Sequence, residues 1–269
     1  MKIALKALPS GAAALEKALI LFNRIVNDRG NTKLADLAAN LALPRSTLYR
    51  LTAVLEGAGL IARLERGRYV AGLPLVDSLR GISVASQLAR LCRPSLRRLA
   101  QTCGATAHLG VMENDMVTYL VKETASTAHA AAFFTRENSQ LEAYCSAVGK
   151  VLLAWLPDAA RVRYLDGAPF VPMTQRTLTD PRALQACLKA VRAEQFARDD
   201  GEISDDLYCL AVPLWTNVEP MIAAISLSFP RRDGQQDDDG AYLAKLRTCA
   251  AELSLKLGNR NGLTILFSL

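Results

Sequence analysis

Apolar residues recur with helical spacing in two segments between Ala13 and Asn40. Residues 13–28 follow a period of about 3.6 residues, and Gly30 marks the end of that helix. A second helix is expected from about Lys33 to Asn40, with Thr32 in the N-cap position. The apolar residues on one side of this second helix are Leu34, Leu37 and Ala38. The spacing therefore predicts two helices that share one core.

A third helix is expected to open at Pro44, because the fixed φ and missing N–H of proline suit a first helical turn. Gly57 and Gly59 indicate its end. Its buried face is expected to hold Leu48, Leu51 and Leu55. The opposite face, near the N-terminal end, holds Arg45, Ser46, Tyr49 and Arg50, with Thr47 on the flank. A helix that enters the major groove of DNA by its N-terminal end needs such short donors and acceptors together with arginines.

Two short strands are expected at residues 61–64 and 68–71, joined by a turn at residues 65–67. The arginines of this hairpin are Arg63, Arg66 and Arg68. Three helices followed by a basic hairpin predict a winged helix-turn-helix over residues 13–73. The alternative is a helical hairpin inside a larger core, with an ordinary solvated polar face.

A linker helix is expected over residues 74–92, with Gly81 as a weak point, and Pro94 is expected to open a separate helix that ends at Gly104. The apolar stripe of the linker consists of Leu75, Val76, Leu79, Ile82 and Leu88. Such a stripe packs either against a partner subunit or within one chain, and periodicity alone does not separate these two arrangements.

Strand patterns dominate the remainder of the chain, residues 93–257. Apolar or alternating segments predict strands at residues 105–112, 116–123, 129–134, 207–215 and 220–229. Helices are expected at about 147–156, 160–165, 181–198 and 237–257, and an acidic loop at 199–206. Because the strands and helices do not alternate as βαβ units, the pattern favours an α+β sensor domain.

The basic charge of the chain is concentrated in its first part. Residues 1–72 hold 11 Lys and Arg against 5 Asp and Glu, whereas the other 197 residues hold 21 of each. A net charge of +6 on the expected helix-turn-helix is typical of nucleic-acid binding.

Targeting signals and metal-site motifs are not evident in the sequence. There is no apolar run of about twenty residues, so no membrane span is expected. Glu16 and Lys17 interrupt the apolar N-terminal stretch, which argues against a signal peptide and favours the cytoplasm. The six cysteines form no C-x-x-C pair or zinc-ligand spacing, so free thiols are expected and no metal or cofactor is.

An enzyme with Cys145 or Cys209 as nucleophile is the main alternative function. A cysteine nucleophile needs a base and an orienting group, but His108 and His129 have no motif around them. Cys209 also lies in an apolar run, which is more typical of a buried thiol. A third hypothesis, a degenerate helix-turn-helix that binds protein, is disfavoured by the intact basic face.

The segments LEKALILF, LADLAANLALPRSTLYRLTAVLEGAGLI, RYVAG, SAVGKVLLA and CLAVP stand in this order along the chain. In that order they resemble the IclR family of bacterial transcription regulators, over about residues 13–257. The resemblance implies a winged helix followed by a GAF-like effector-binding domain, assembled as a homodimer or tetramer. It also implies a repressor or activator of a catabolic operon that binds double-stranded operator DNA. Effectors in the family include glyoxylate, pyruvate and aromatic acids.

The resemblance assigns site residues to both domains. The DNA-reading positions are Arg45, Ser46, Thr47, Tyr49 and Arg50, with Arg66 and Arg68 in the wing. The effector pocket is expected to hold Ser146 and Ala147 on one wall, facing Asp199, Cys209, Ser226 and Ser228. The start of a helix at Ala147 offers N–H groups to a carboxylate. The apolar part of the pocket is expected to come from Phe133, Phe134 and Tyr144, with room for an aromatic acid. Without the resemblance, each serine is as readily a satisfied core hydroxyl.

One departure from the family pattern concerns the acidic loop. Asp206 stands where the family commonly has glycine, and residues 199–206 contain five acids. Such a loop would repel an anionic effector unless the acids are paired or face solvent. Otherwise they face a hydroxyl, an amine or a neighbouring arginine.

Overall fold

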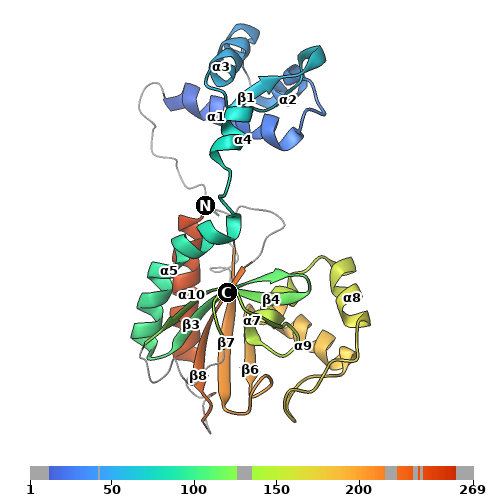
Figure 1. The fold of residues 1–269 in the computed structure, drawn as a ribbon, viewed down its shortest axis with the longest axis vertical. Coiled ribbons are helices and arrows are strands. Elements are labelled where there is room, and N and C mark those ends of the chain that lie inside the picture. The colour runs from blue at the N-terminus through green and yellow to red at the C-terminus, as the bar shows by residue number, and fades with distance from the viewer. Residues whose placement is uncertain are drawn as a thin grey trace. The chain divides into compact units, whose positions relative to one another are not determined.

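The computed structural model describes residues 12–41, 43–125, 135–215, 223–232, 236 and 239–258. The chain divides into two compact units, residues 1–82 and residues 83–269. Each unit has its own hydrophobic core, and Figure 1 shows the helical first unit and the sheet of the second. In the described part of the chain, no helix is both long and apolar enough to cross a bilayer.

The first unit is a winged helix-turn-helix, as the sequence predicted. Its elements are α1 (Ala12–Asp28), α2 (Leu34–Leu37), the 3₁₀ turn η1 (Ala39–Leu41), α3 (Arg45–Gly57), β1 (Ile61–Arg63), the turn η2 (Glu65–Gly67), β2 (Tyr69–Ala71) and α4 (Leu73–Ser78). The strands pair antiparallel, with Ile61 opposite Ala71. The buried core consists of Leu21, Ile25, Leu34, Ala38, Leu48, Leu55, Ile61 and Tyr69.

Local details of the helix ends differ from expectation. Lys33, not Thr32, occupies the N-cap of α2, and the backbone N–H of Thr32 instead donates to Oδ2 of Asp28 at 2.7 Å. The carboxylate of Asp28 thus holds the turn after α1, which leaves α2 without a side-chain cap. Pro44 is the N-cap of α3 rather than its first helical residue, because its ψ of 142° is extended.

The buried face of α3 also differs by one position. Thr52 is buried in place of Leu51, which is half-buried at the edge of the core. The hydroxyl of Thr52 donates to the Leu48 carbonyl at 2.9 Å. Because this polar group is satisfied within its own helix, it can lie among apolar neighbours at little cost.

The expected single linker helix over 74–92 is wrong. The helix α4 ends at Ser78, and α5 (Val84–Cys103) begins only after Gly81, whose φ is +76°. The hydroxyl of Ser83 accepts a hydrogen bond from the N–H of Ser86 at 3.0 Å and fixes the new start. The helix α5 then continues through Pro94, where a separate helix was expected to begin. Burial of the face that includes Leu96 against the sheet offsets the hydrogen bond that Pro94 lacks.

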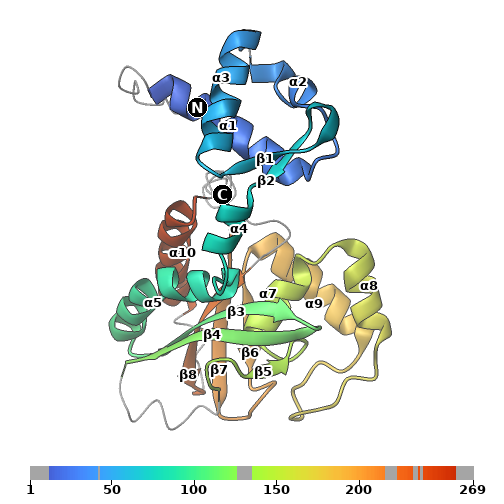
Figure 2. The ribbon, with the colours of Figure 1, turned by 45° about the horizontal axis from the view of Figure 1, so that its top comes forward.

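The second unit is built on a six-stranded antiparallel sheet in the order β5-β4-β3-β8-β7-β6. Its strands are β3 (Thr106–Glu113), β4 (Met116–Thr124), β5 (Gln140–Glu142), β6 (Ala197–Asp200), β7 (Leu207–Leu214) and β8 (Ala223–Pro230). Helices α5 and α10 (Asp239–Lys256) cover one face of the sheet (Figure 2). The other face carries α7 (Ala147–Ala154) with α8 (Asp158–Asp166) and α9 (Pro181–Glu194). This architecture confirms the predicted α+β class.

The end of α9 and the strand after it differ from expectation. The helix expected over 181–198 ends at Glu194, because Gln195 adopts a left-handed conformation with φ +62°. The residues that follow form the edge strand β6, which no pattern had indicated. The strand expected over 129–134 lies outside the described residues.

The helix α7 lies in unusually close contact with the turn before it. A Cβ atom placed on Gly149 would be 2.2 Å from the backbone oxygen of Ala143. Only glycine permits this approach, and the approach sets the position of the first turn of α7.

We therefore expect Gly149→Ala to lower the free energy of unfolding by about 1–3 kcal/mol, since the added methyl group must displace backbone atoms. Urea unfolding of the purified protein measures the change. The control is Gly240→Ala in α10, where nothing lies within 4 Å of the added Cβ. An unfolding free energy for Gly149→Ala equal to that of the control would show that the close approach is not required.

Candidate functional site

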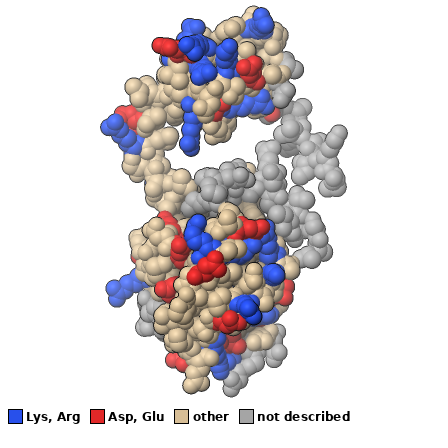
Figure 3. All heavy atoms as spheres, turned by 90° about the vertical axis from the view of Figure 1, so that its right-hand side faces the viewer, with Lys and Arg blue, Asp and Glu red and all other residues tan. Residues whose placement is uncertain are grey.

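The polar face of α3 is presented to solvent. Arg45, Ser46, Tyr49 and Arg50 are exposed and Thr47 is half-buried. The opposite side of the helix is anchored in the core by Leu48 and Leu55. In Figure 3 the Lys and Arg side chains gather over the N-terminal unit. The helix thus offers the short polar groups and the arginines that groove binding requires.

The two expected wing arginines differ from each other. Arg66 is exposed at the turn, in a left-handed conformation with φ +59°. Arg68 is half-buried, and its Nε atom is buried without a hydrogen-bond partner among the described residues. Arg66 is therefore the more accessible of the two.

All six residues expected around an effector line one cavity in the second unit. They are Ser146, Ala147, Asp199, Cys209, Ser226 and Ser228. Three of them meet because β6, β7 and β8 are neighbouring strands: Asp199 is opposite Cys209, and Cys209 is opposite Ser228. The start of α7 forms the facing wall. The cavity has a volume of about 20 Å³, which is room for a single water molecule and not for an aromatic ring.

The hydroxyl of Ser146 holds the start of α7. It accepts from the N–H of Gly149 at 3.1 Å and donates to the carbonyl of Glu142 at 3.2 Å. The hydroxyl of Ser146 is thus engaged in capping the helix. The donors that this wall offers a ligand are therefore the remaining backbone N–H groups of the first turn of α7.

A chain of hydrogen-bonded side chains that sequence reasoning missed runs along the strand wall. Thr135 Oγ1 lies 3.0 Å from Nε2 of His108, whose Nδ1 lies 3.5 Å from Ser228 Oγ. Ser228 Oγ in turn lies 3.1 Å from Cys209 Sγ. Burial lowers the pKa of His108 to about 3, so its imidazole is neutral. Only the pairing of β3 with β8, which sets His108 opposite Ser226, could have indicated this role.

The apolar lining also differs from expectation. Tyr144 does not line the cavity, because its ring stacks on Phe170 and its hydroxyl donates to the Val171 carbonyl at 2.7 Å. Phe133 and Phe134 lie outside the described residues. The apolar side chains that line the cavity are Leu141, Val148, Ile203 and Leu207, and Tyr119 lines it as well.

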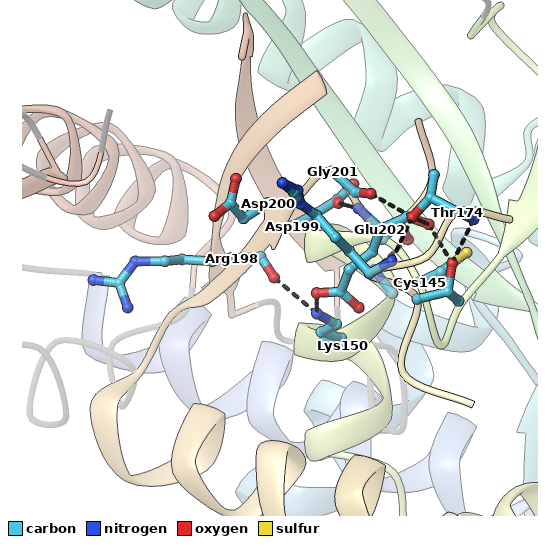
Figure 4. A network of polar contacts seen from close by, with 12 residues as sticks. Cys145, Lys150, Thr174, Arg198, Asp199, Asp200, Gly201 and Glu202 are labelled. Atoms are coloured by element: carbon cyan, nitrogen blue, oxygen red, sulfur yellow. Dashed lines mark hydrogen bonds and ion pairs between the residues drawn. The ribbon is translucent and has the colours of Figure 1, made fainter. Parts of the chain in front are cut away.

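The five acids of residues 199–206 lie in different surroundings. Arg231 donates from Nε to Oδ1 of Asp200 at 2.5 Å, and Asp205 and Asp206 are exposed. Glu202 is buried in an ion pair with Lys150, as Figure 4 shows. Of the five acids, Asp199 is the one that lines the cavity.

Lys150 joins α7 to the strand that carries Asp199. Besides Glu202, its ammonium group donates to the carbonyl of Arg198 at 2.9 Å. Thr174 Oγ1 donates to the Gly201 carbonyl at 2.6 Å, and Thr177 Oγ1 to the Glu202 carbonyl at 2.6 Å. The bonds of Lys150 hold the turn after β6 against α7, and those of Thr174 and Thr177 hold it against the segment that precedes α9 (Figure 4).

Asp199 is fully buried in this surrounding. Its Oδ1 atom accepts from the N–H of Glu202 at 2.7 Å, whereas its Oδ2 atom has no hydrogen-bond partner among the described residues. Burial raises the pKa of Asp199 to about 7, although Lys150 and the backbone N–H groups of Glu202 and Ile203 oppose this rise. The cavity wall thus holds a carboxyl group that is partly protonated near neutral pH.

The cysteines considered as nucleophiles are poorly suited to that role. Burial raises the pKa of Cys145 to about 12 and that of Cys209 well above its ordinary value. A reactive cysteine needs the opposite shift. In the described part of the chain, no group of three or more His, Cys, Asp and Glu side chains is placed to hold a metal ion.

Two family models together match most of the chain. The model described as "Bacterial transcriptional regulator IclR C-terminal" matches residues 82–255. The model described as "IclR helix-turn-helix domain" matches residues 14–65. The chain is 30% identical over 250 residues to the HTH-type transcriptional regulator XynR of Escherichia coli strain K12. The aligned region covers 93% of this chain and 97% of XynR.

Solved structures of similar proteins share the fold. The IclR of Thermotoga maritima is 26% identical, with a TM-score of 0.59 over 92% of this chain and 99% of that one. An IclR homolog from Microbacterium hydrocarbonoxydans, solved in complex with 4-hydroxybenzoate, is 25% identical. Its TM-score is 0.59 over 91% of this chain and 98% of that one.

Proposed function

The chain belongs to the IclR family of bacterial transcriptional regulators, and we propose that it controls a catabolic operon in response to a small organic acid. It is a DNA-binding regulator and not an enzyme, because the matching family models and the relatives are transcriptional regulators. The observation that carries the proposed effector class is the cavity that joins the first turn of α7 to the polar row on β6, β7 and β8. The 4-hydroxybenzoate bound by the Microbacterium homolog supports an acid of this kind.

The positive end of a helix and hydroxyl groups can hold a carboxylate without a cation. The described residues that line the cavity include no lysine or arginine, so recognition rests on hydrogen bonds. Because the cavity has room for little more than one water molecule, we propose that binding of an acid displaces its walls. A ligand that binds an expanded form better shifts the protein toward it, and this is how the acid would alter DNA affinity.

In the N-terminal unit, we propose that α3 reads the operator and that Arg66 contacts DNA from the wing. The residues assigned to α3 are Arg45, Ser46, Thr47, Tyr49 and Arg50. The operator is in the cytoplasm, where we place the protein.

We propose further that the chain works as a homodimer or tetramer, since one helix reads only a short half-site. Apolar side chains after the wing support this. Val76, Leu79 and Ile82 are each about half exposed, at 49%, 52% and 49%.

We expect sedimentation of the wild type to show a dimer or tetramer. The substitution Leu79→Glu should weaken this association, because it places a charge among the apolar side chains. Val162→Glu on α8, where Val162 is 51% exposed, is the control. A wild-type monomer at micromolar concentration that still binds its operator tightly would contradict the proposal.

We expect Arg50→Ala to weaken the affinity for DNA. Because one phosphate contact is lost, the slope of the logarithm of the binding constant against the logarithm of the salt concentration should fall in magnitude by about one unit. The measurement is the affinity for an operator selected in vitro with the wild type, at several salt concentrations. Arg163→Ala, an exposed arginine on α8, is the control. If affinity and salt slope are unchanged in Arg50→Ala, Arg50 does not contact DNA.

For the effector, a thermal-shift screen of organic acids, including 4-hydroxybenzoate, glyoxylate and pyruvate, identifies a ligand. A ligand at a hundredfold its Kd stabilises the fold by roughly 2.7 kcal/mol. We expect Ser226→Ala to weaken the binding free energy of this effector by about 0.5–1.5 kcal/mol, because one hydrogen bond is lost. Ala147→Leu should block binding by filling the site. Ser254→Ala, a buried serine on α10 outside the cavity, is the control. Equal affinity in Ser226→Ala and the control would place the effector elsewhere.

A further inference from the structure

The buried charges beside the cavity do not balance when all of them are ionised. Asp199 and Glu202 are both buried acids, and Lys150 is the buried cation that faces them. Lys150 is engaged by Glu202 and by the carbonyl of Arg198. An ionised Asp199 is therefore a buried negative charge with one oxygen that has no hydrogen-bond partner among the described residues.

An entering carboxylate would make this imbalance worse. It would lie in the same cavity as Asp199, and the described lining offers no lysine or arginine to separate the two charges. Two carboxylates in a shared, dry site do not both ionise, because their repulsion is large where the dielectric constant is low. One of the pair must hold a proton.

We propose that Asp199 takes up a proton from solvent when an organic acid enters the cavity, and that its neutral carboxyl then donates a hydrogen bond from Oδ2 to the carboxylate of the acid. Effector binding is then coupled to the uptake of one proton. The proposal rests on the acid effector class proposed above. It gives the unpartnered oxygen a partner and keeps the buried cluster of Lys150, Glu202 and Asp199 neutral.

The groups that face Asp199 make it the natural acceptor of that proton. Tyr119 on β4, Cys145 before α7 and Cys209 on β7 all have raised pKa values, so they are already neutral. Glu202 is paired with Lys150. The pKa of Asp199 is already about 7, so protonation near neutral pH needs little further shift.

His108 is the competing acceptor in the cavity. Its pKa of about 3 reflects burial and the neighbouring charge of Lys122. To accept a proton at neutral pH, this imidazole would need its pKa to rise above 7. Asp199 needs almost no such rise, so the proton goes to the carboxyl group.

The coupling has a defined pH dependence. Below the pKa of free Asp199, the proton is already bound and affinity is independent of pH. Above it, affinity should fall about tenfold for each pH unit, because one proton must be taken up for each acid bound. Asp199→Asn carries a neutral donor at all pH values and should remove this dependence.

Isothermal titration calorimetry at pH 8, with 4-hydroxybenzoate and with the strongest acid from the screen, measures proton uptake directly. Titrations in two buffers of different ionisation enthalpy give the number of protons bound per acid. We expect close to one for the wild type and close to zero for Asp199→Asn. Asp200→Asn, whose carboxyl is paired with Arg231 outside the cavity, should behave as the wild type.

Each other outcome has a definite meaning. Binding without proton uptake in the wild type overturns the inference while leaving the proposed effector class intact, and this measurement does not depend on any variant. Uptake that persists in Asp199→Asn but is lost in His108→Gln also overturns it, by assigning the proton to the histidine. If no acid binds, the proposed effector class itself fails, and the inference fails with it.

The stability of the protein without added acid gives an independent measurement. Since the pKa of Asp199 is raised on folding, its contribution to stability is present below its unfolded value and is lost as pH rises through about 7. The free energy of unfolding of the wild type, relative to Asp199→Asn, should therefore decline between about pH 4 and pH 7. A difference that stays constant over this range would show that Asp199 has an ordinary pKa and would overturn the inference.

Discussion

The ion pair between Lys150 and Glu202 holds the effector-binding unit in its working arrangement. Lys150 is on α7 and Glu202 follows β6, so one buried contact fixes the helix against the edge of the sheet. Removing two charges from water is costly, and only close pairing with further hydrogen bonds offsets that cost. The carbonyl of Arg198 accepts a further hydrogen bond from Lys150, and the hydroxyls of Thr174 and Thr177 donate to the backbone carbonyls of the turn that carries Glu202. We infer that this buried ion pair contributes more to a unique geometry than to net stability.

That geometry decides which of the acidic side chains of residues 199–206 lines the cavity. With Glu202 held by Lys150 and Asp200 held by Arg231, the strand β6 presents Asp199 inward. The opposite wall depends on Gly149, because no other residue lets α7 approach the Ala143 backbone so closely. The start of a helix and a polar row on three strands are thus brought together by two ion pairs and one glycine.

The sequence predicted features that depend on local spacing and missed those that depend on distant partners. The face of α3 follows from the period of Leu48 and Leu55, and the wing follows from alternation around Gly67. The strand β6 was missed, since only pairing with β7 extends those residues. His108 was missed for the same reason, because its partners Thr135 and Ser228 lie 27 and 120 residues away. The six cavity residues came from family resemblance, since no spacing relates Ser146 to Ser228.

The two units use charge in opposite ways. Residues 1–72 have a net charge of +6, and the exposed arginines of this part include Arg45, Arg50 and Arg66, which can attract a polyanion. In the second unit, by contrast, the buried carboxylates of Glu202 and Asp239 pair with Lys150 and Arg198 of the same chain. Salt screens the first kind of interaction strongly and the second kind weakly. Ionic strength should therefore affect the affinity for DNA strongly, whereas in our proposal hydrogen bonds and the proton on Asp199 govern the response to the effector.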